Sequence, residues 1–180
     1  DRCEIVRDLY FNVPLIAHEV CHYTALRDFY ALKDKFINSG APLPWWVDEE
    51  IKLIEEKGFK GAFHEMYKAS KHFQFICWKT AYEEMRKSAL LGGFHFLQFA
   101  DTDVYENSNG VVDCFDDETC VKPDDFLKFN GDRVIIADLG NRNRYCSDVL
   151  IVPIYFSNLG EDTETSADVA ITVEKGGKTY

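Results

Sequence analysis

No stretch of this 180-residue sequence approaches the roughly 20 consecutive apolar residues that a membrane-spanning helix needs, so a membrane protein is not expected. The sequence is also short of positive charge: 20 lysine and arginine residues stand against 31 aspartate and glutamate residues, which gives a net charge of −11. This balance argues against nucleic acids and anionic membrane surfaces as main partners. Apolar material is plentiful, since 46% of the residues are hydrophobic and 14% aromatic, enough for a sizeable core.

The opening residues lack the apolar core of a secretion signal, because three of the four residues Asp1–Glu4 are charged. A segment cut from a longer polypeptide would show the same absence. The sequence therefore leaves the compartment open, with a periplasmic or extracellular location favoured over the cytoplasm.

Cysteine pairs of the Cys-x-x-Cys type are absent, so a structural zinc site is not expected. The six cysteines are Cys3, Cys21, Cys77, Cys114, Cys120 and Cys146. Cys114 and Cys120 bracket an acidic, turn-like loop, where either a local disulfide or two free thiols is compatible with the spacing. The acidic run Asp113–Glu118 does not have the ligand spacing of an EF-hand, which favours a solvated loop over a calcium site.

The first two thirds of the sequence predict a β-strand, a long helical region and a second β-strand. In chain order the expected elements are a strand over 13–17, helices over 25–37, 49–57 and 59–86, and a strand over 94–99. Asp48 is the expected N-cap of the second helix, and a break near Ser70 could divide the third. Such an order is typical of a βαβ unit with two parallel, buried strands, here with an insertion between them.

The pattern changes after a long loop over 101–120 and a short helix over 122–129. From residue 133 onward the chain is rich in β-forming residues, with strands expected over 134–137, 149–156 and 167–173 and a hairpin turn at Lys175–Lys178. No helical period separates these strands. They indicate an antiparallel β-sandwich that is incomplete, because a sandwich needs about seven strands. A domain boundary is therefore expected between residues 135 and 136.

A single carboxylate ends the first apolar strand. The stretch Val13–Tyr23 reads Val-Pro-Leu-Ile-Ala-His-Glu-Val-Cys-His-Tyr, in which His18 and His22 flank Glu19. A buried strand that delivers a carboxylate at its end is typical of a barrel enzyme with its catalytic groups at one mouth. A His18–His22 zinc pair would need a helix at this position and is not expected.

These residues resemble glycoside hydrolase family 2, which includes β-galactosidases, β-glucuronidases and β-mannosidases. Pro14–His22 is similar to the strand that carries the family's catalytic nucleophile, and Leu91–Asp101 is similar to its Gly-Gly-Phe strand. The closer similarity is to a divergent branch with a Ser-His-Glu-x-Gly-Gln-Tyr motif, matched by Ala17–Tyr23, and a Thr-Pro-Glu-Glu-Phe-x-x-Phe segment, matched by Lys122–Phe129. The resemblance covers roughly residues 10–140.

The resemblance implies an α/β fold: residues 1–135 as the C-terminal part of a (β/α)8 TIM barrel, and residues 136–180 as the start of the following β-sandwich. It implies a retaining β-glycosidase that removes terminal sugars from oligo- or polysaccharides, with Glu19 as nucleophile and without cofactor or metal. The general acid/base would lie upstream of residue 1, so the segment alone would be inactive. The rest of the parent polypeptide, a carbohydrate and a further copy of the protein are the expected partners.

Several residues are candidates for sugar binding, each with a structural alternative. His18 and His22 could bind sugar hydroxyls or serve as framework residues, and strand alternation would turn His18 away from Glu19. Asp101 could bind sugar or cap the next turn, and Gln98 could reach the pocket. Trp45 and Trp46 could form a stacking platform or pack beneath a loop.

Departures from the family's pattern at Cys21, His22, Phe96 and Gln98 leave the sugar undetermined and keep a second function open. This is a non-catalytic carbohydrate-binding or scaffold protein derived from the same fold. A third reading is an unrelated α+β protein in which Glu19 has a structural role.

Overall fold

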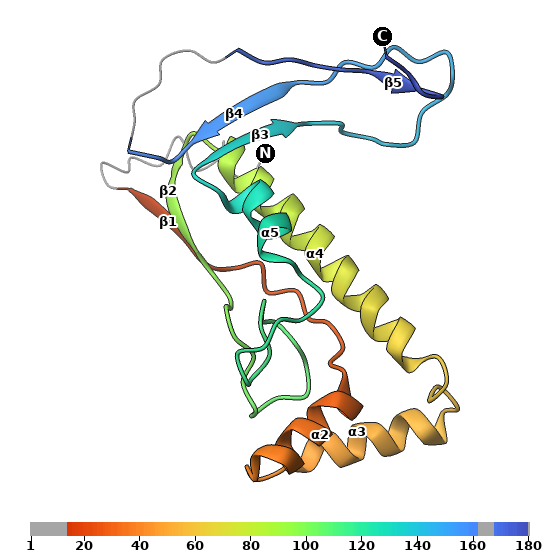
Figure 1. The fold of residues 1–180 in the computed structure, drawn as a ribbon. Helices are drawn as coiled ribbons and strands as arrows, with labels where there is room; N and C mark the ends of the chain where they lie inside the picture. Colours follow the sequence, from red (N-terminus) through yellow and green to blue (C-terminus); the bar gives the residue numbers. More distant parts are fainter. Residues whose placement is uncertain (1–13, 162–167, 180) are drawn as a thin grey trace. The chain divides into compact units, whose positions relative to one another are not determined.

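The structure, a computed structural model, describes residues 14–161 and 168–179 (Figure 1). The chain divides into two units, Asp1–Gly131 and Asp132–Tyr180. The division lies four residues before the boundary expected from the sequence. Each unit is described by itself below.

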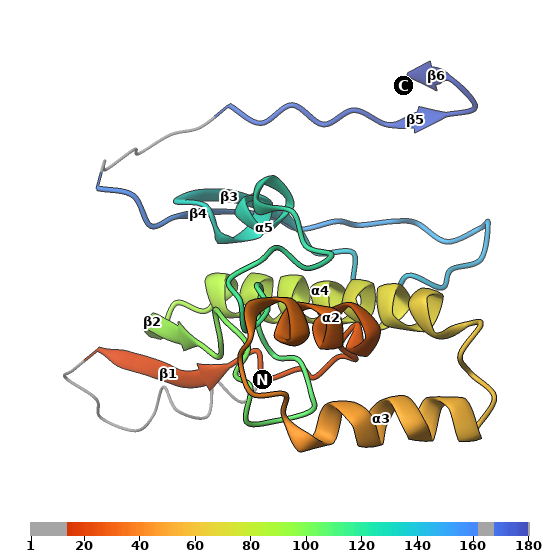
Figure 2. The ribbon, with the colours of Figure 1, turned by 60° about the horizontal axis from the view of Figure 1, so that its bottom comes forward.

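The first unit contains two paired strands, β1 (Leu15–Val20) and β2 (Leu91–Phe96). They are parallel, as the βαβ pattern predicts, and lie side by side (Figures 1 and 2). Both begin at positions other than those expected, because the glycines of Leu91–Gly93 are part of β2 and Pro14 precedes β1. Since a proline has no N–H to donate, it is suited to the edge of a strand and not to its interior.

Three helices connect β1 to β2. They are α2 (Phe29–Ser39), α3 (Trp45–Glu56) and α4 (Phe63–Lys87). Asp28 caps α2 by accepting a hydrogen bond from the N–H of Ala31 at 3.2 Å, and Gly40 ends it with a left-handed φ of 71°. α4 is one continuous helix, so the break considered near Ser70 is wrong. The Ser70 hydroxyl instead accepts a hydrogen bond from the N–H of Leu26 at 2.9 Å.

α3 begins four residues earlier than expected. The sequence suggests that Asp48 is its N-cap, but the helix starts at Trp45, directly after Pro44. Trp46 and Val47 are buried and pack in the core between α2, α3 and the start of α4. Burial of large apolar side chains contributes about 1.5–3 kcal/mol each, more than a single cap does, so packing sets this helix start.

Two clusters of buried side chains form the core of the first unit. One joins α2, α3 and Phe63; its buried members are Phe29, Leu32, Phe36, Trp46, Val47, Ile54 and Phe63. The other joins the sheet, α4 and the short helix α5 (Pro123–Asn130); its buried members are Cys21, Trp78, Tyr82, Val121 and Phe129. Phe94 and Phe96 of β2 contact the Tyr82 ring, so α4 covers one face of the β1–β2 pair.

The opposite face of the β1–β2 pair carries no helix contact of this kind in the described residues, and Ile16 on it is 45% exposed. Within the described residues of this unit no further strand joins the pair, and no barrel is closed. The partial barrel therefore stays a prediction.

The second unit contains two separate antiparallel pairs. β3 (Arg133–Ala137) pairs with β4 (Ile154–Asn158), and β5 (Glu174–Lys175) pairs with β6 (Lys178–Thr179). The expected turn at Lys175–Lys178 is confirmed: Gly176 and Gly177 join β5 to β6 with φ values of 58° and 75° (Figure 2). β4 is shorter than the expected strand over 149–156, and residues 168–173 are not in a strand. The β-sandwich also stays a prediction.

No helix among the described residues is long and apolar enough to cross a membrane.

Candidate functional site

Glu19 lies in an irregular part of β1. Ala17 is paired with Phe94 and Val20 with Phe96, so two residues of β1, His18 and Glu19, stand opposite the single residue His95 of β2. Such a two-against-one arrangement is a β-bulge, which bends a strand and redirects a side chain. Glu19 is exposed, and its backbone has a left-handed φ of 52°.

His18 and His95 meet on the face of the sheet that α4 does not cover. Because Phe94 and Phe96 point to α4, the residue between them, His95, points to the other face. The His18 ring lies 5.4 Å from the His95 ring in an edge-on arrangement, so His18 shares that face. The expectation that alternation would separate His18 from Glu19 assumed a regular strand, and the bulge removes that regularity. His95 was not among the candidates from the sequence.

Cys21, two residues after Glu19, is a packing residue. Its side chain lies in the core with Trp78, and its carbonyl oxygen accepts a hydrogen bond from Trp78 Nε1 at 3.0 Å. Burial raises the pKa of the Cys21 thiol to about 12, which favours the neutral thiol of a packing residue. Its backbone φ is 67°, a second left-handed residue within three positions.

The other sequence candidates do not form one cluster with Glu19. His22 is exposed after β1, and Gln98 is half-buried after β2. The two tryptophans have different roles: Trp45 is 79% exposed at the start of α3, while Trp46 is 2% exposed. Trp46 Nε1 donates a hydrogen bond to the Asp103 carbonyl at 3.0 Å. A stacking platform made of both rings is therefore wrong, because Trp46 is part of the core.

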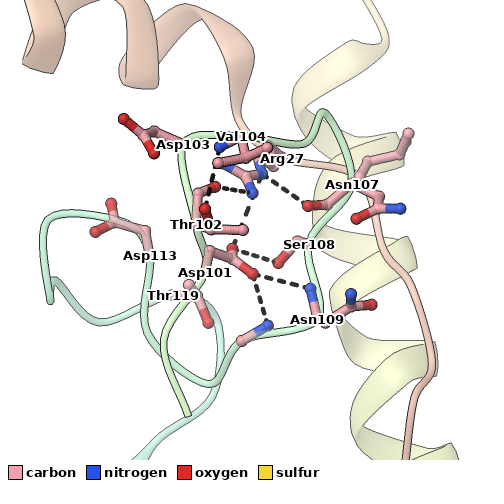
Figure 3. A network of polar contacts seen from close by, with 12 residues as sticks. Arg27, Asp101, Thr102, Asp103, Val104, Asn107, Ser108, Asn109, Asp113 and Thr119 are labelled. Atoms are coloured by element: carbon pink, nitrogen blue, oxygen red, sulfur yellow. Dashed lines mark hydrogen bonds and ion pairs between the residues drawn. The ribbon is translucent and has the colours of Figure 1, made fainter. Parts of the chain in front are cut away.

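Asp101 is buried and forms hydrogen bonds within the loop after β2 (Figure 3). Its Oδ1 accepts hydrogen bonds from the N–H groups of Asn109 and Gly110 at 2.8 and 2.6 Å. Its Oδ2 accepts one from the Ser108 hydroxyl at 2.7 Å. These three hydrogen bonds within the loop favour the structural alternative for Asp101, in which it caps a turn, over sugar binding.

Arg27 joins the same loop from the segment before α2 (Figure 3). Its Nε donates to the Asn107 carbonyl at 3.0 Å, and its Nη2 donates to the Thr102 carbonyl at 2.6 Å. Its Nε also lies 4.0 Å from Asp101 Oδ2, and the guanidinium carbon lies 5.0 Å from the centre of the Trp46 ring. The side chain is 5% exposed, so this is a buried ion pair.

α4 contributes a buried lysine to this network. Lys71 Nζ donates to the Ser108 hydroxyl and to the Gly110 carbonyl, each at 3.0 Å. Burial lowers the pKa of Lys71 to about 8, although the charge of Asp101 opposes this effect. One turn on, Gln74 Nε2 donates to the carbonyls of Tyr23 and Ser108 at 2.6 and 2.8 Å.

Sequence reasoning missed this network, although one signal for it was present. Lys71, Gln74, Trp78 and Tyr82 follow one another at helical spacing and form the buried stripe of α4. A lysine and a glutamine in line with two buried aromatic residues mark polar groups that need partners inside the protein.

A cavity of about 220 Å³ lies against the network. Its walls come from the segment before α2, from α2, from α4 and from the loop after β2. The charged residues that line it are Arg27, Asp28, Lys35, Lys71, Asp101, Asp113 and Glu118. Within the described part of the chain, no group of three or more His, Cys, Asp or Glu residues could hold a metal ion.

Cys114 and Cys120 are free thiols, so the disulfide alternative is not formed. Asp113, at the start of the acidic run, accepts hydrogen bonds from the N–H groups of Phe115 and Asp117 at 2.8 and 3.1 Å. Its Oδ2 also lies 2.5 Å from Lys35 Nζ. Burial, together with a hydrogen bond to Cys120, raises the pKa of Tyr67 well above its usual range.

No family model, curated protein or solved structure matches this chain.

Proposed function

We propose that this chain is the nucleophile-bearing segment of a retaining β-glycosidase similar to glycoside hydrolase family 2, with Glu19 as the nucleophile. On this proposal β1 and β2 are the last two strands of a (β/α)8 barrel, and the rest of the barrel comes from a longer polypeptide. The substrate is a terminal β-linked sugar of an oligo- or polysaccharide.

The observation that carries the proposal is the backbone of Glu19. A left-handed φ at a non-glycine residue costs of order 1–3 kcal/mol and persists where the surrounding structure enforces it, most often at active sites. Glu19 has this conformation inside a β-bulge, and its carboxylate is exposed at the end of an apolar strand. Cys21 and Asp116 share a left-handed φ, and Glu19 differs from them in lying within the β-bulge, opposite His95.

The backbone of Cys21 adds support. In the motif Ser-His-Glu-x-Gly-Gln-Tyr, position 21 of this chain corresponds to the glycine, and the Cys21 φ of 67° is a conformation that glycine adopts without cost. A glycine at this position would have the observed backbone without strain, so the match of the motif at Cys21 is compatible with the conformation found here.

The uncovered face of the sheet fits a barrel interior. The His18–His95 pair supplies polar groups beside Glu19 on the face opposite α4. In a barrel that face points inward, and the carboxyl ends of its strands surround the substrate. Parallel sheets are normally covered on both faces, so an exposed Ile16 on this face is consistent with missing neighbours.

The chemistry follows from these positions. The Glu19 carboxylate attacks the anomeric carbon as the bond to the leaving oxygen breaks, and a second carboxyl group about 5–5.5 Å away protonates that oxygen. Water then attacks the glycosyl ester, with its proton passing to the second carboxylate, and Glu19 is released. The second carboxyl group belongs to the part of the barrel outside this chain. On this proposal His18 and His95, whose rings are in contact, hydrogen-bond hydroxyls of the bound sugar.

The test is to treat the parent polypeptide with a panel of 2-deoxy-2-fluoro-β-glycosides and to map the adduct by peptide mass spectrometry. The expected result is one covalent sugar on the peptide that contains Glu19, absent in Glu19→Gln and present in Glu49→Gln. Glu49 is a suitable control because it is exposed on α3 and its replacement is chemically identical.

Two other results would replace the proposal. Saccharide binding without any adduct would favour a non-catalytic carbohydrate-binding protein of the same fold. Neither adduct nor binding, with Glu19→Gln changing only stability, would favour a structural role for Glu19.

A further inference from the structure

A second cavity of the first unit is lined almost wholly by apolar side chains. It has a volume of about 450 Å³ and lies between the C-terminal part of α4, the end of β2, the loop after β2 and α5. Apart from Glu118 and Asn130, all its lining residues are apolar or aromatic. Small-molecule sites have volumes of about 300–1,000 Å³ and the same composition, an apolar wall with a few polar groups.

Three aromatic rings in the wall of this cavity pack against one another. The ring centres of Tyr82, Phe96 and Phe126 lie 5.7–5.9 Å apart. The three rings come from α4, β2 and α5, so their contacts join three elements and fix the wall. The cavity is therefore formed before a ligand enters it, and its wall suits an aromatic ring or a short alkyl chain.

Two further apolar side chains at the cavity are in contact with water. Phe99 is 69% exposed and Leu127 is 55% exposed. Large apolar side chains that stay exposed beside a concave surface are typical of ligand-binding grooves. An apolar ligand in this cavity would remove part of their surface from water, which favours binding.

The charge at the cavity is negative. Among the described residues that line it, Glu118 is the only charged one, and its side chain is 58% exposed. Its Oε2 lies 3.3 Å from Nζ of Lys122, an exposed residue outside the cavity wall, and such surface pairs contribute little. The net charge of −11 attracts cations to the chain as a whole, and aromatic ring faces attract them at short range.

We infer that this cavity binds a small organic ammonium ion with an aromatic or alkyl body, the chemistry of a phenylalkylamine. The apolar body lies against the rings of Tyr82, Phe96 and Phe126, and the ammonium group lies toward Glu118. A neutral molecule of the same shape gains the apolar contacts but not the attraction to the carboxylate, and an anion is repelled.

This cavity is separate from the proposed catalytic position. Phe96 points to α4, since its ring lies 5.4 Å from that of Trp78. The His18–His95 pair beside Glu19 lies on the opposite face of the β1–β2 pair. Ammonium binding therefore does not depend on glycosidase activity.

The test is calorimetric titration of the parent polypeptide with 2-phenylethylammonium and, as its uncharged match, with 2-phenylethanol, at pH 7 and low ionic strength. The ammonium ion should bind saturably and about three- to fivefold more tightly than the alcohol, the order expected for one partly exposed charge pair. Glu118→Gln should bring the two affinities together. Glu56→Gln, an exposed position of α3 with the same chemical change, should leave the difference in place.

A second pair of variants tests the apolar contacts. Phe99→Ala should weaken binding of both probes about three- to tenfold, and it is expected to fold because Phe99 is largely exposed. Phe59→Ala removes another exposed ring, one outside the cavity wall, and should change neither affinity. No saturable binding of the ammonium ion, an alcohol that binds as tightly, or binding that Phe99→Ala leaves unchanged overturns the inference.

Glu19→Gln should bind the ammonium ion as the unaltered protein does. Failure of the glycosidase proposal and failure of this inference are therefore separate results.

Discussion

At the scale of single residues, Cys21 combines a buried side chain with a left-handed backbone. Replacing it with glycine removes the backbone cost but also removes buried sulfur, so a single variant would mix two effects. The comparison of Cys21→Gly with Cys21→Ala isolates the backbone, because both lose the thiol. The glycine variant should be more stable than the alanine variant by about 1 kcal/mol, measured by urea unfolding. An alanine variant of equal or higher stability would contradict a strained φ at this position.

Lys71 gives a pH dependence with a defined sign. Its pKa is about 8 in the folded protein, against 10.5 for a lysine in water, so between these values the unfolded chain binds more protons. Stability therefore rises with pH in this window. Between about pH 7 and about pH 9.5 the contribution of Lys71 should rise by about 2 kcal/mol.

The matched measurement is the pH dependence of unfolding in the unaltered protein and in Lys71→Met. The difference between them removes the opposite contribution of Cys21, whose raised folded-state pKa lowers stability as pH rises above the ordinary thiol value. Parallel pH curves for the two proteins would show that Lys71 keeps an ordinary pKa.

At the scale of elements, the loop after β2 depends on one carboxylate. Asp101→Asn keeps the shape but removes the charge that compensates Arg27 and Lys71, and its amide NH₂ replaces one acceptor oxygen. Breaking a buried ion pair costs about 3–5 kcal/mol, so a large loss of stability is expected. Asp103→Asn, two residues on and exposed, should change stability by less than about 0.5 kcal/mol.

Limited proteolysis tests the effect of Asp101→Asn at the loop itself. Cleavage within residues 101–120 should become faster in Asp101→Asn than in Asp103→Asn, since the N–H groups of Asn109 and Gly110 lose an anionic acceptor. Equal cleavage rates would mean that other contacts order this loop.

The elements differ in how far the sequence predicts them. The parallel pairing of β1 and β2 follows from two short apolar runs joined by helices, and the β5–β6 turn follows from Gly176-Gly177, because these are local signals. The start of α3 was missed because long-range burial of Trp46 outweighs the cap at Asp48.

The residues of the candidate site also differ in how far the sequence predicts them. Glu19 and His18 can be found from the motif, whereas the bulge depends on pairing with a distant strand (Ala17 with Phe94, Val20 with Phe96) and has no local signature. Arg27, Lys71 and Asp101 meet only through tertiary packing, so spacing along the chain does not reveal their contacts.

At the scale of the whole molecule, the described residues of the first unit leave one face of a parallel sheet uncovered, and those of the second unit expose many apolar side chains. The exposed ones from residue 145 to residue 159 are Tyr145, Val149, Leu150, Ile151, Ile154, Tyr155, Phe156 and Leu159. Exposed apolar patches of this kind mark interaction surfaces or missing partners. On the proposed function, the remainder of a barrel and of a sandwich would supply those partners.

A substitution at Ile16 tests whether the parent polypeptide covers the face of the β1–β2 pair opposite α4. It lies on the sheet face opposite α4 and is 45% exposed. If the face becomes the interior of a barrel in the parent polypeptide, Ile16→Asn buries an amide there and removes apolar contacts, at a cost of about 2–4 kcal/mol. In the isolated 180-residue chain the same change should cost less than about 1 kcal/mol, because the side chain meets water. Urea unfolding of both forms, with and without the substitution, measures the difference. An equal, small cost in both would mean that the parent leaves this face open, and the barrel proposal would lose its physical basis even if Glu19 were later found to bind sugar.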